Sequence, residues 1–91
     1  MSVVARHTPT NLTIEKYAEA NRRLVEAELW PNPDDYHVCF GLEGSLRVSE
    51  IWDSREQMQA FGERLMPILA EVGIEFDAAP EISDVHNIAR R

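Results

Sequence analysis

The chain has 91 residues, of which 44% are hydrophobic, and a formal net charge of −7 at pH 7. This length fits one domain, residues 1–91, with a small core for its surface. The negative charge argues against nucleic-acid binding and against an anionic membrane surface, and no apolar run is long enough for a membrane span. The single cysteine excludes an internal disulfide and fits a reducing compartment, so we expect a cytoplasmic protein.

The first third of the chain predicts a strand followed by a helix. Residues 2–7 are short and apolar enough for an opening strand. Thr13 suits a helix N-cap, with Leu12 and Tyr17 placed to form a hydrophobic staple, and the helix should run to about Leu29. Its expected buried stripe is Ile14, Tyr17, Ala18, Leu24 and Val25, with Ala27 as a further candidate. Two prolines within residues 30–35 break the pattern and predict a linker.

A hairpin should follow, because residues 36–40 and 46–52 are rich in aromatic and β-branched residues around the turn residues Gly41 to Gly44. If Glu43 and Gly44 form the two-residue loop, residue 37 lies opposite residue 50 and residue 39 lies opposite residue 48. Residues that lie opposite each other on neighbouring strands share a sheet face. The residues predicted to line one face are then His37, Cys39, Val48, Glu50 and Trp52. A loop one residue longer or shorter would flip every partner to the other face.

The second helix has the clearest signal in the sequence. Apolar residues recur every three or four positions, which places them on one face: Met58, Phe61, Leu65, Ile68 and Val72. Ser54 and Gln57 predict a capping box at its start, and Gly73 predicts its end. Residues 73–80 then form an irregular connection, and residues 82–88 predict a last strand.

The expected order is therefore β-α-β-β-α-β. This order predicts a ferredoxin-like α+β domain, in which two helices cover one face of an antiparallel sheet. The other face has nothing in this chain to cover it, so a second copy of the chain is the economical cover. We expect a homodimer.

At this level of detail the sequence resembles a known family. Residues Glu50 to Ser54 read Glu-x-Trp-x-Ser, and a helix with Phe61 and then Leu65-Met66-Pro67 follows. This pattern is similar to the dimeric α+β barrel superfamily, in the branch named for antibiotic biosynthesis monooxygenases. His37 and the run Val85-His86-Asn87 also resemble small members that have no assigned activity.

The resemblance implies a homodimeric α+β barrel with a pocket in each subunit between the sheet and the helices. Relatives include cofactor-independent oxygenases of polyketide-like phenols, haem-degrading enzymes, lactone isomerases and polyketide cyclases. The haem-degrading branch has a histidine ligand in the second half of its second helix, and residues 64–72 contain no histidine. Oxygenase relatives use an asparagine on the strand with the tryptophan, where this chain has Val48 and Glu50.

The candidate site follows from the predicted hairpin face. His37 opposite Glu50 could be a pair that moves a proton, because a neighbouring carboxylate keeps an imidazole basic; it could also be a cross-strand polar pair that only satisfies two groups. The candidate substrate-binding residues are Trp52, Phe61, Cys39, Val48 and Leu65. For Trp52 and Phe61 core packing is the competing interpretation, and for Cys39 a small buried apolar role is the stronger one. The three histidines lack the close spacing of a metal site, and His7 and His86 are weaker candidates because the parity of their strands is open.

Two functions remain open on the sequence. The first is a small enzyme that uses no metal or organic cofactor and acts as a monooxygenase, isomerase or cyclase on a flat, apolar or aromatic molecule. The second is a non-catalytic dimeric module that binds a small ligand or has a structural role. An open cavity with converging polar groups would favour the first, and a space filled by Trp52, Phe61 and Leu65 would favour the second.

Overall fold

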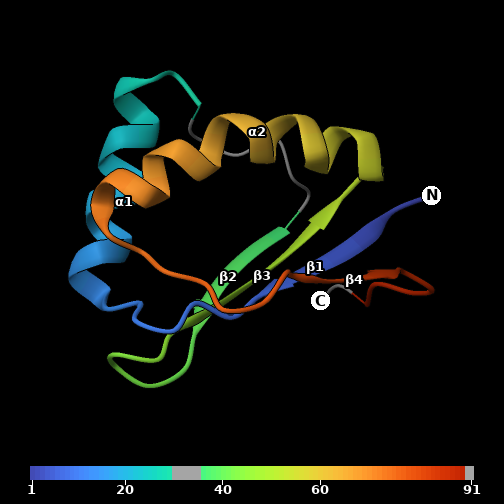
Figure 1. Cartoon of the computed structure of the whole chain (residues 1–91). Helices are drawn as coiled ribbons and strands as arrows, with labels where there is room; N and C mark the ends of the chain where they lie inside the picture. The colour runs from blue at the N-terminus through green and yellow to red at the C-terminus, as the bar shows by residue number, and fades with distance from the viewer. Residues whose placement is uncertain (30–35, 90–91) are drawn as a thin grey trace.

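The computed structural model describes residues 1–29 and 36–89. The elements are β1 (Val3–His7), α1 (Ile14–Glu26), β2 (Tyr36–Phe40), β3 (Arg47–Trp52), α2 (Arg55–Val72) and β4 (Glu81–Asp84). The four strands form one antiparallel sheet in the order β2-β3-β1-β4, and both helices lie on the same side of it (Figure 1). The predicted β-α-β-β-α-β fold is confirmed.

The hairpin between β2 and β3 has the predicted register. His37 pairs with Glu50, and Cys39 pairs with Val48. The Ser45 amide donates to the Leu42 carbonyl at 2.9 Å, so Glu43 and Gly44 occupy the centre of the turn. Gly44 has a φ of +89°, a conformation that costs glycine little and other residues more. The turn therefore fixes which side chains of β2 and β3 point toward the helices.

Both helices begin where the sequence predicted. Thr13 accepts from the Lys16 amide and Ser54 accepts from the Gln57 amide, each at 3.1 Å. The Gln57 side chain reaches back one residue further than in a standard capping box, to the Asp53 amide at 3.1 Å. At the other end of α2, Gly73 adopts the left-handed conformation of a helix C-cap, as predicted.

The helix-covered face of the sheet holds the core. One cluster of buried residues joins the sheet to both helices: Val3, Ala5, Leu24, Trp52, Met58 and Phe61. A second lies beside it: Leu12, Ala20, Leu46 and Ile74. The predicted buried face of α2 is confirmed, because Met58 and Phe61 are buried and Leu65, Ile68 and Val72 are half-buried.

Three parts of the prediction differ from the structure. Ile14 and Val25, expected in the buried stripe of the first helix, are 62% and 56% exposed, because Ala20 and Leu24 define the face that meets the sheet. Ala18 and Ala27, predicted for the same stripe, are exposed as well. The helix ends at Glu26 rather than near Leu29. The last strand ends at Asp84, because β1 offers pairing partners only for residues 81–84. The predicted linker at residues 30–35 lies outside the described residues.

Candidate functional site

A buried carboxylate lies at the centre of the helix-covered face. Glu50 is 3% exposed and belongs to β3, which has β2 on one side and β1 on the other. The residue paired with Glu50 on β2 is His37, and the residue paired with Glu50 on β1 is Ala5. His7, two residues beyond Ala5, shares its face and reaches Glu50 diagonally. The small side chain at position 5 thus lies beside Glu50, while imidazoles approach from both neighbouring strands.

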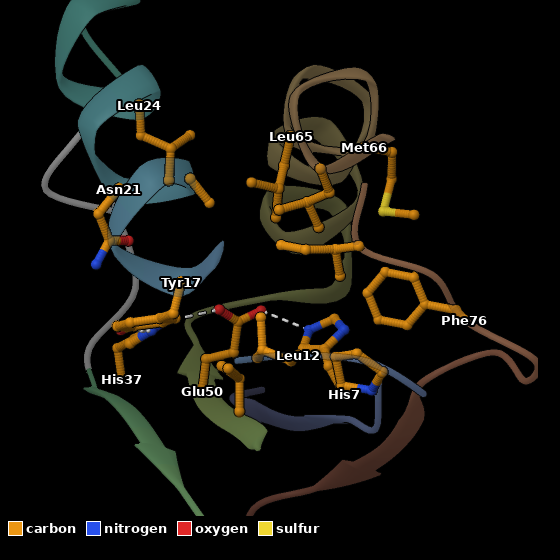
Figure 2. A pocket seen from close by; sticks show the side chains of 15 residues that line it. His7, Leu12, Tyr17, Asn21, Leu24, His37, Glu50, Leu65, Met66 and Phe76 are labelled. Carbon is orange, nitrogen blue, oxygen red and sulfur yellow. Dashed lines mark hydrogen bonds and ion pairs between the residues drawn. The ribbon is translucent and has the colours of Figure 1, made fainter. Parts of the chain in front are cut away.

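Three donors surround the Glu50 carboxylate. Nε2 of His7 lies 2.8 Å from Oε1, and Nε1 of Trp52 donates to the same oxygen at 3.2 Å. Nδ1 of His37 lies 3.3 Å from Oε2. Figure 2 shows Glu50 between the two histidines, with His37 below α1 and His7 on the side of Phe76. Both oxygens of the buried acid are therefore engaged.

These donors decide the charge of Glu50. Burial by itself raises the pKa of a carboxyl group, and it is the largest single influence here. The hydrogen bonds from His37 and His7, the electrostatic attraction that His7 exerts when it is protonated, and the hydrogen bond from Trp52 together outweigh burial and lower the pKa of Glu50 to about 2. Glu50 is thus a carboxylate at neutral pH, suited to hold and orient imidazoles rather than to donate a proton.

Tyr17 extends the network from α1. Its hydroxyl lies 2.9 Å from Nε2 of His37, and the two rings stack with their centroids 6.1 Å apart. Both nitrogens of His37 therefore have a partner, Tyr17 on one side and Glu50 on the other. His7 differs, because its Nε2 faces Glu50 and the geometry of the ring turns its Nδ1 away from that carboxylate.

Two apolar cavities meet at this network. The smaller has a volume of about 70 Å³ and is lined by Tyr17, His37 and Val48 among mostly apolar residues. The larger has a volume of about 300 Å³ and is lined by Trp52, Phe61 and the connection at residues 78–80. Residues that line both are His7, Glu50, Leu65, Met66 and Phe76. His7 and Glu50 thus lie at the wall where the two spaces adjoin.

The structure brings most of the sequence-predicted site residues together. His37 and Glu50 are in contact, Trp52 donates to Glu50, and Phe61 packs on Trp52 with ring centroids 5.2 Å apart. Val48 and Leu65 line the cavities. Cys39 lies on the same sheet face but packs beside the cluster of Leu12 and Leu46, it lines neither cavity, and burial raises its pKa. It fits the small apolar role.

Sequence reasoning gave too little weight to two residues. His7 was a weak candidate because nothing near it in the chain fixed the parity of β1; the pairing of Ala5 with Glu50 fixes it. Tyr17 was assigned to a hydrophobic staple, and its ring does pack against the Leu12 cluster. Its hydroxyl could not be placed, because its partner His37 comes from a different strand.

The described residues contain neither a metal-binding cluster nor a helix that could span a membrane. Within residues 1–29 and 36–89, no group of three or more histidine, cysteine, aspartate or glutamate side chains could hold a metal ion. In the same part of the chain, neither helix has both the length and the apolar character that crossing a membrane demands.

No protein-family model matches the sequence, and no curated protein matches it. Solved structures do match. A conserved protein from Methanosarcina mazei Go1 aligns with a TM-score of 0.58 and 13% identity, over 91% of this chain and 89% of its own. A Deinococcus radiodurans protein provisionally named an antibiotic biosynthesis monooxygenase aligns with a TM-score of 0.59 and 11% identity, over 100% of this chain and 98% of its own.

These likenesses show the fold. The resemblance read from Glu50 to Ser54 and the second helix is confirmed at that level. The de novo designed protein Foldit4 also aligns, with a TM-score of 0.54 and 18% identity over the whole of both chains. A fold shared by a protein provisionally named a monooxygenase and by a designed protein does not specify a reaction, so the function depends on the residues of the site.

Proposed function

We propose that this protein is a small enzyme that removes a proton from a flat, mostly apolar molecule with an enolisable or phenolic group. One observation carries the proposal: an ionised, buried carboxylate orients two imidazoles at the wall of two apolar cavities. Burying a charged group costs stability unless the group is paired. Buried ionised groups with shifted pKa values occur more often at catalytic centres than elsewhere in proteins.

His7 is the proton acceptor in this proposal. It lines the larger cavity, whose volume of about 300 Å³ is at the lower end of the range for small-molecule sites. Its Nε2 donates to Glu50, so Nδ1 has the lone pair that can take a proton. The new imidazolium then lies 2.8 Å from the Glu50 carboxylate, which stabilises its charge. His37 contacts Tyr17 and Glu50 through both nitrogens and supports the carboxylate.

The cavity favours a planar, apolar substrate. The rings of Trp52 and Phe61 line the cavity from the core, where they are 0% and 6% exposed, and Met58, Leu65 and Phe76 complete a mostly apolar lining. The Glu50 carboxylate disfavours an anionic group nearby and favours a hydroxyl or an enolisable ketone facing His7. Oxygenation, isomerisation and cyclisation each can begin with this deprotonation. The likeness in fold to the Deinococcus radiodurans protein makes oxygenation one of the reactions to test.

We further infer that the protein is a homodimer. The strand residues that alternate with the core face point to the sheet's other side, where neither helix packs, and they include Val4, Tyr36, Val38, Phe40 and Ile51. Tyr36 is 52% exposed in the single chain. The same side also has Arg6, Arg47 and Ser49. An open sheet face with this many apolar side chains on a small domain favours association. Light scattering should give about twice the monomer mass of 10.4 kDa; a stable monomer would contradict the inference.

The function is tested by deuterium exchange into 1-tetralone, a planar ketone with exchangeable α-protons, followed by proton NMR in deuterated water. We expect the protein to accelerate exchange over buffer, and His7→Gln to abolish the acceleration because glutamine cannot take the proton. His86→Gln is the matched control, since His86 is exposed. If 1-tetralone and 2-naphthol bind but the wild-type protein exchanges no faster than buffer, the site is a ligand-binding module and not this enzyme.

A further inference from the structure

The two cavities that meet at Glu50 differ in what they can hold. An apolar protein cavity of roughly 150 Å³ takes up one benzene ring. The larger cavity, at about 300 Å³, exceeds that size, and the smaller one, at about 70 Å³, has less than half of it. The larger cavity therefore has space for an aromatic ring, whereas the smaller one has space for a short aliphatic chain and for no ring.

Apolar side chains from several parts of the chain line the smaller cavity. Leu24 belongs to α1, Val48 to β3 and Leu69 to α2, and Leu12 and Ile74 come from the connections next to the helices. Moving a methylene group from water to an apolar surrounding is favourable, so this lining favours an alkyl group. The lining and the volume thus agree on the kind of group that the smaller cavity takes.

The proposed proton acceptor lies where the two cavities adjoin. His7 and Glu50 line both cavities, as do Leu65, Met66 and Phe76. Figure 2 shows Leu65 and Met66 on α2, on the helix side of Glu50 and His7. Met66 is 48% exposed and has a flexible, unbranched side chain, so it can change rotamer and leave a passage beside His7. An atom that gives its proton to His7 therefore has a cavity on each side.

We propose that the substrate is an aryl alkyl ketone, with its aromatic ring in the larger cavity and its short alkyl chain in the smaller one. The proposal rests on the proposed function and selects an enolisable group over a phenolic one. In such a ketone the α-carbon lies between the aryl carbonyl group and the alkyl chain, so it can lie beside His7 while both ends are buried. The hydroxyl oxygen of a phenol is a terminal atom, and no chain continues from it into the smaller cavity.

The proton step balances at this position. A C–H bond of the α-carbon breaks, the proton forms a bond to Nδ1 of His7, and the electron pair stays on the ketone as an enolate. The imidazolium that results lies 2.8 Å from the Glu50 carboxylate. In deuterated water His7 exchanges this proton with the solvent, and the reverse transfer places a deuteron on the α-carbon. The step requires no oxidant or reductant.

A series of phenyl ketones tests how the ligand is divided between the cavities. The probes are acetophenone, propiophenone, butyrophenone, valerophenone and heptanophenone, and Kd is measured by ¹H–¹⁵N NMR titration of the protein. Each methylene added up to valerophenone should lower Kd roughly fourfold, because it is removed from water. Heptanophenone should bind no more tightly than valerophenone, because its longer chain exceeds the space in the smaller cavity.

Val48→Ala identifies the cavity that holds the chain, since Val48 lines the smaller cavity and not the larger one. The change removes two methyl groups, so heptanophenone should now bind more tightly than valerophenone, while acetophenone binds as before. Val72→Ala is the matched control at a half-buried position that lines neither cavity, and it should keep the wild-type order. A wild-type Kd that does not fall with chain length, or an order that Val48→Ala leaves unchanged, would overturn the inference.

Exchange of the α-protons in deuterated water gives the second readout. Relative to the rates in buffer, kcat/KM for butyrophenone should exceed that for acetophenone roughly tenfold, because two more methylenes are buried. If both ketones exchange faster than in buffer but equally so, with equal Kd values, the proposed function stands and this inference fails. If Kd follows the predicted series while no ketone exchanges faster than in buffer, the division of the ligand stands and the proposed function fails.

Discussion

Replacing Glu50 by glutamine tests whether the buried network is ionised as described. The pKa of Glu50 is about 2 in the folded protein and 4.5 for an unperturbed carboxyl. Because the folded pKa is the lower one, the carboxylate stabilises the fold fully above the unfolded pKa and progressively less as pH falls toward 2. A separation of this size corresponds to roughly 3 kcal/mol, a large part of the stability of a small domain.

The assay is urea unfolding of the wild-type protein and of Glu50→Gln at about pH 5.5 and about pH 3, both below the pKa of a free histidine, so that the imidazoles stay charged in the unfolded state. We expect the variant to be less stable at the higher pH and roughly half of the difference to disappear at the lower one, because Glu50 in the folded protein is still mostly ionised at pH 3. Glu63→Gln, an exposed change on α2, is the control and should show no such convergence. A difference that is equal at both pH values would mean that Glu50 is not the stabilising carboxylate.

Two further predictions concern the frame around the site. Phe61→Ala should reduce the free energy of unfolding by roughly 3–5 kcal/mol, since Phe61 is 6% exposed and packs on Trp52. Gln59→Ala, a change at an exposed position, should alter the free energy of unfolding by about 0.5 kcal/mol or less. Equal effects of the two substitutions in chemical unfolding would contradict the assigned buried face of α2. Gly41→Ala should lower the melting temperature more than Gly44→Ala. Both glycines have a positive φ, but only at Gly41 would an added Cβ come close to the Ser45 carbonyl oxygen, at 3.3 Å. The reverse order of melting temperatures would show that this steric contact does not determine the cost of the substitution.

Local signals in the sequence determined most of the fold. The turn at Glu43 and Gly44 sets the register of β2 and β3, so the contact of His37 with Glu50 could be predicted from residues close together in the chain. Thr13, Ser54 and Gly73 mark helix boundaries through contacts that span only a few residues. Such features depend on local geometry, which a single sequence expresses directly.

The rest of the site depends on non-local pairing. His7 reaches Glu50 because β1 lies beside β3 with Ala5 opposite Glu50, and no turn connects those two strands. Tyr17 reaches His37 only after α1 has packed on the sheet. Helical periodicity could identify Tyr17 as sheet-facing, but not which side chain it would meet there. For Ile14 and Val25 the apolar side chain alone was misleading, because a narrow stripe is enough to cover this sheet.

A final comparison separates a catalytic network from a structural one. Glu50→Gln leaves His7, His37 and Trp52 facing an amide that offers one accepting oxygen instead of two. The triple variant His7→Leu, His37→Leu and Glu50→Leu removes the two imidazoles together with the acid. The buried Trp52 N–H and the half-buried Tyr17 hydroxyl each lose one hydrogen-bond partner, and the buried Trp52 N–H costs roughly 1–3 kcal/mol. Replacing a buried charged network by apolar side chains is often neutral or stabilising, so the triple variant should unfold at a higher urea concentration than Glu50→Gln. It should also lose all acceleration of 1-tetralone exchange. A triple variant less stable than the single one would indicate that the network serves mainly to hold the sheet and helices together.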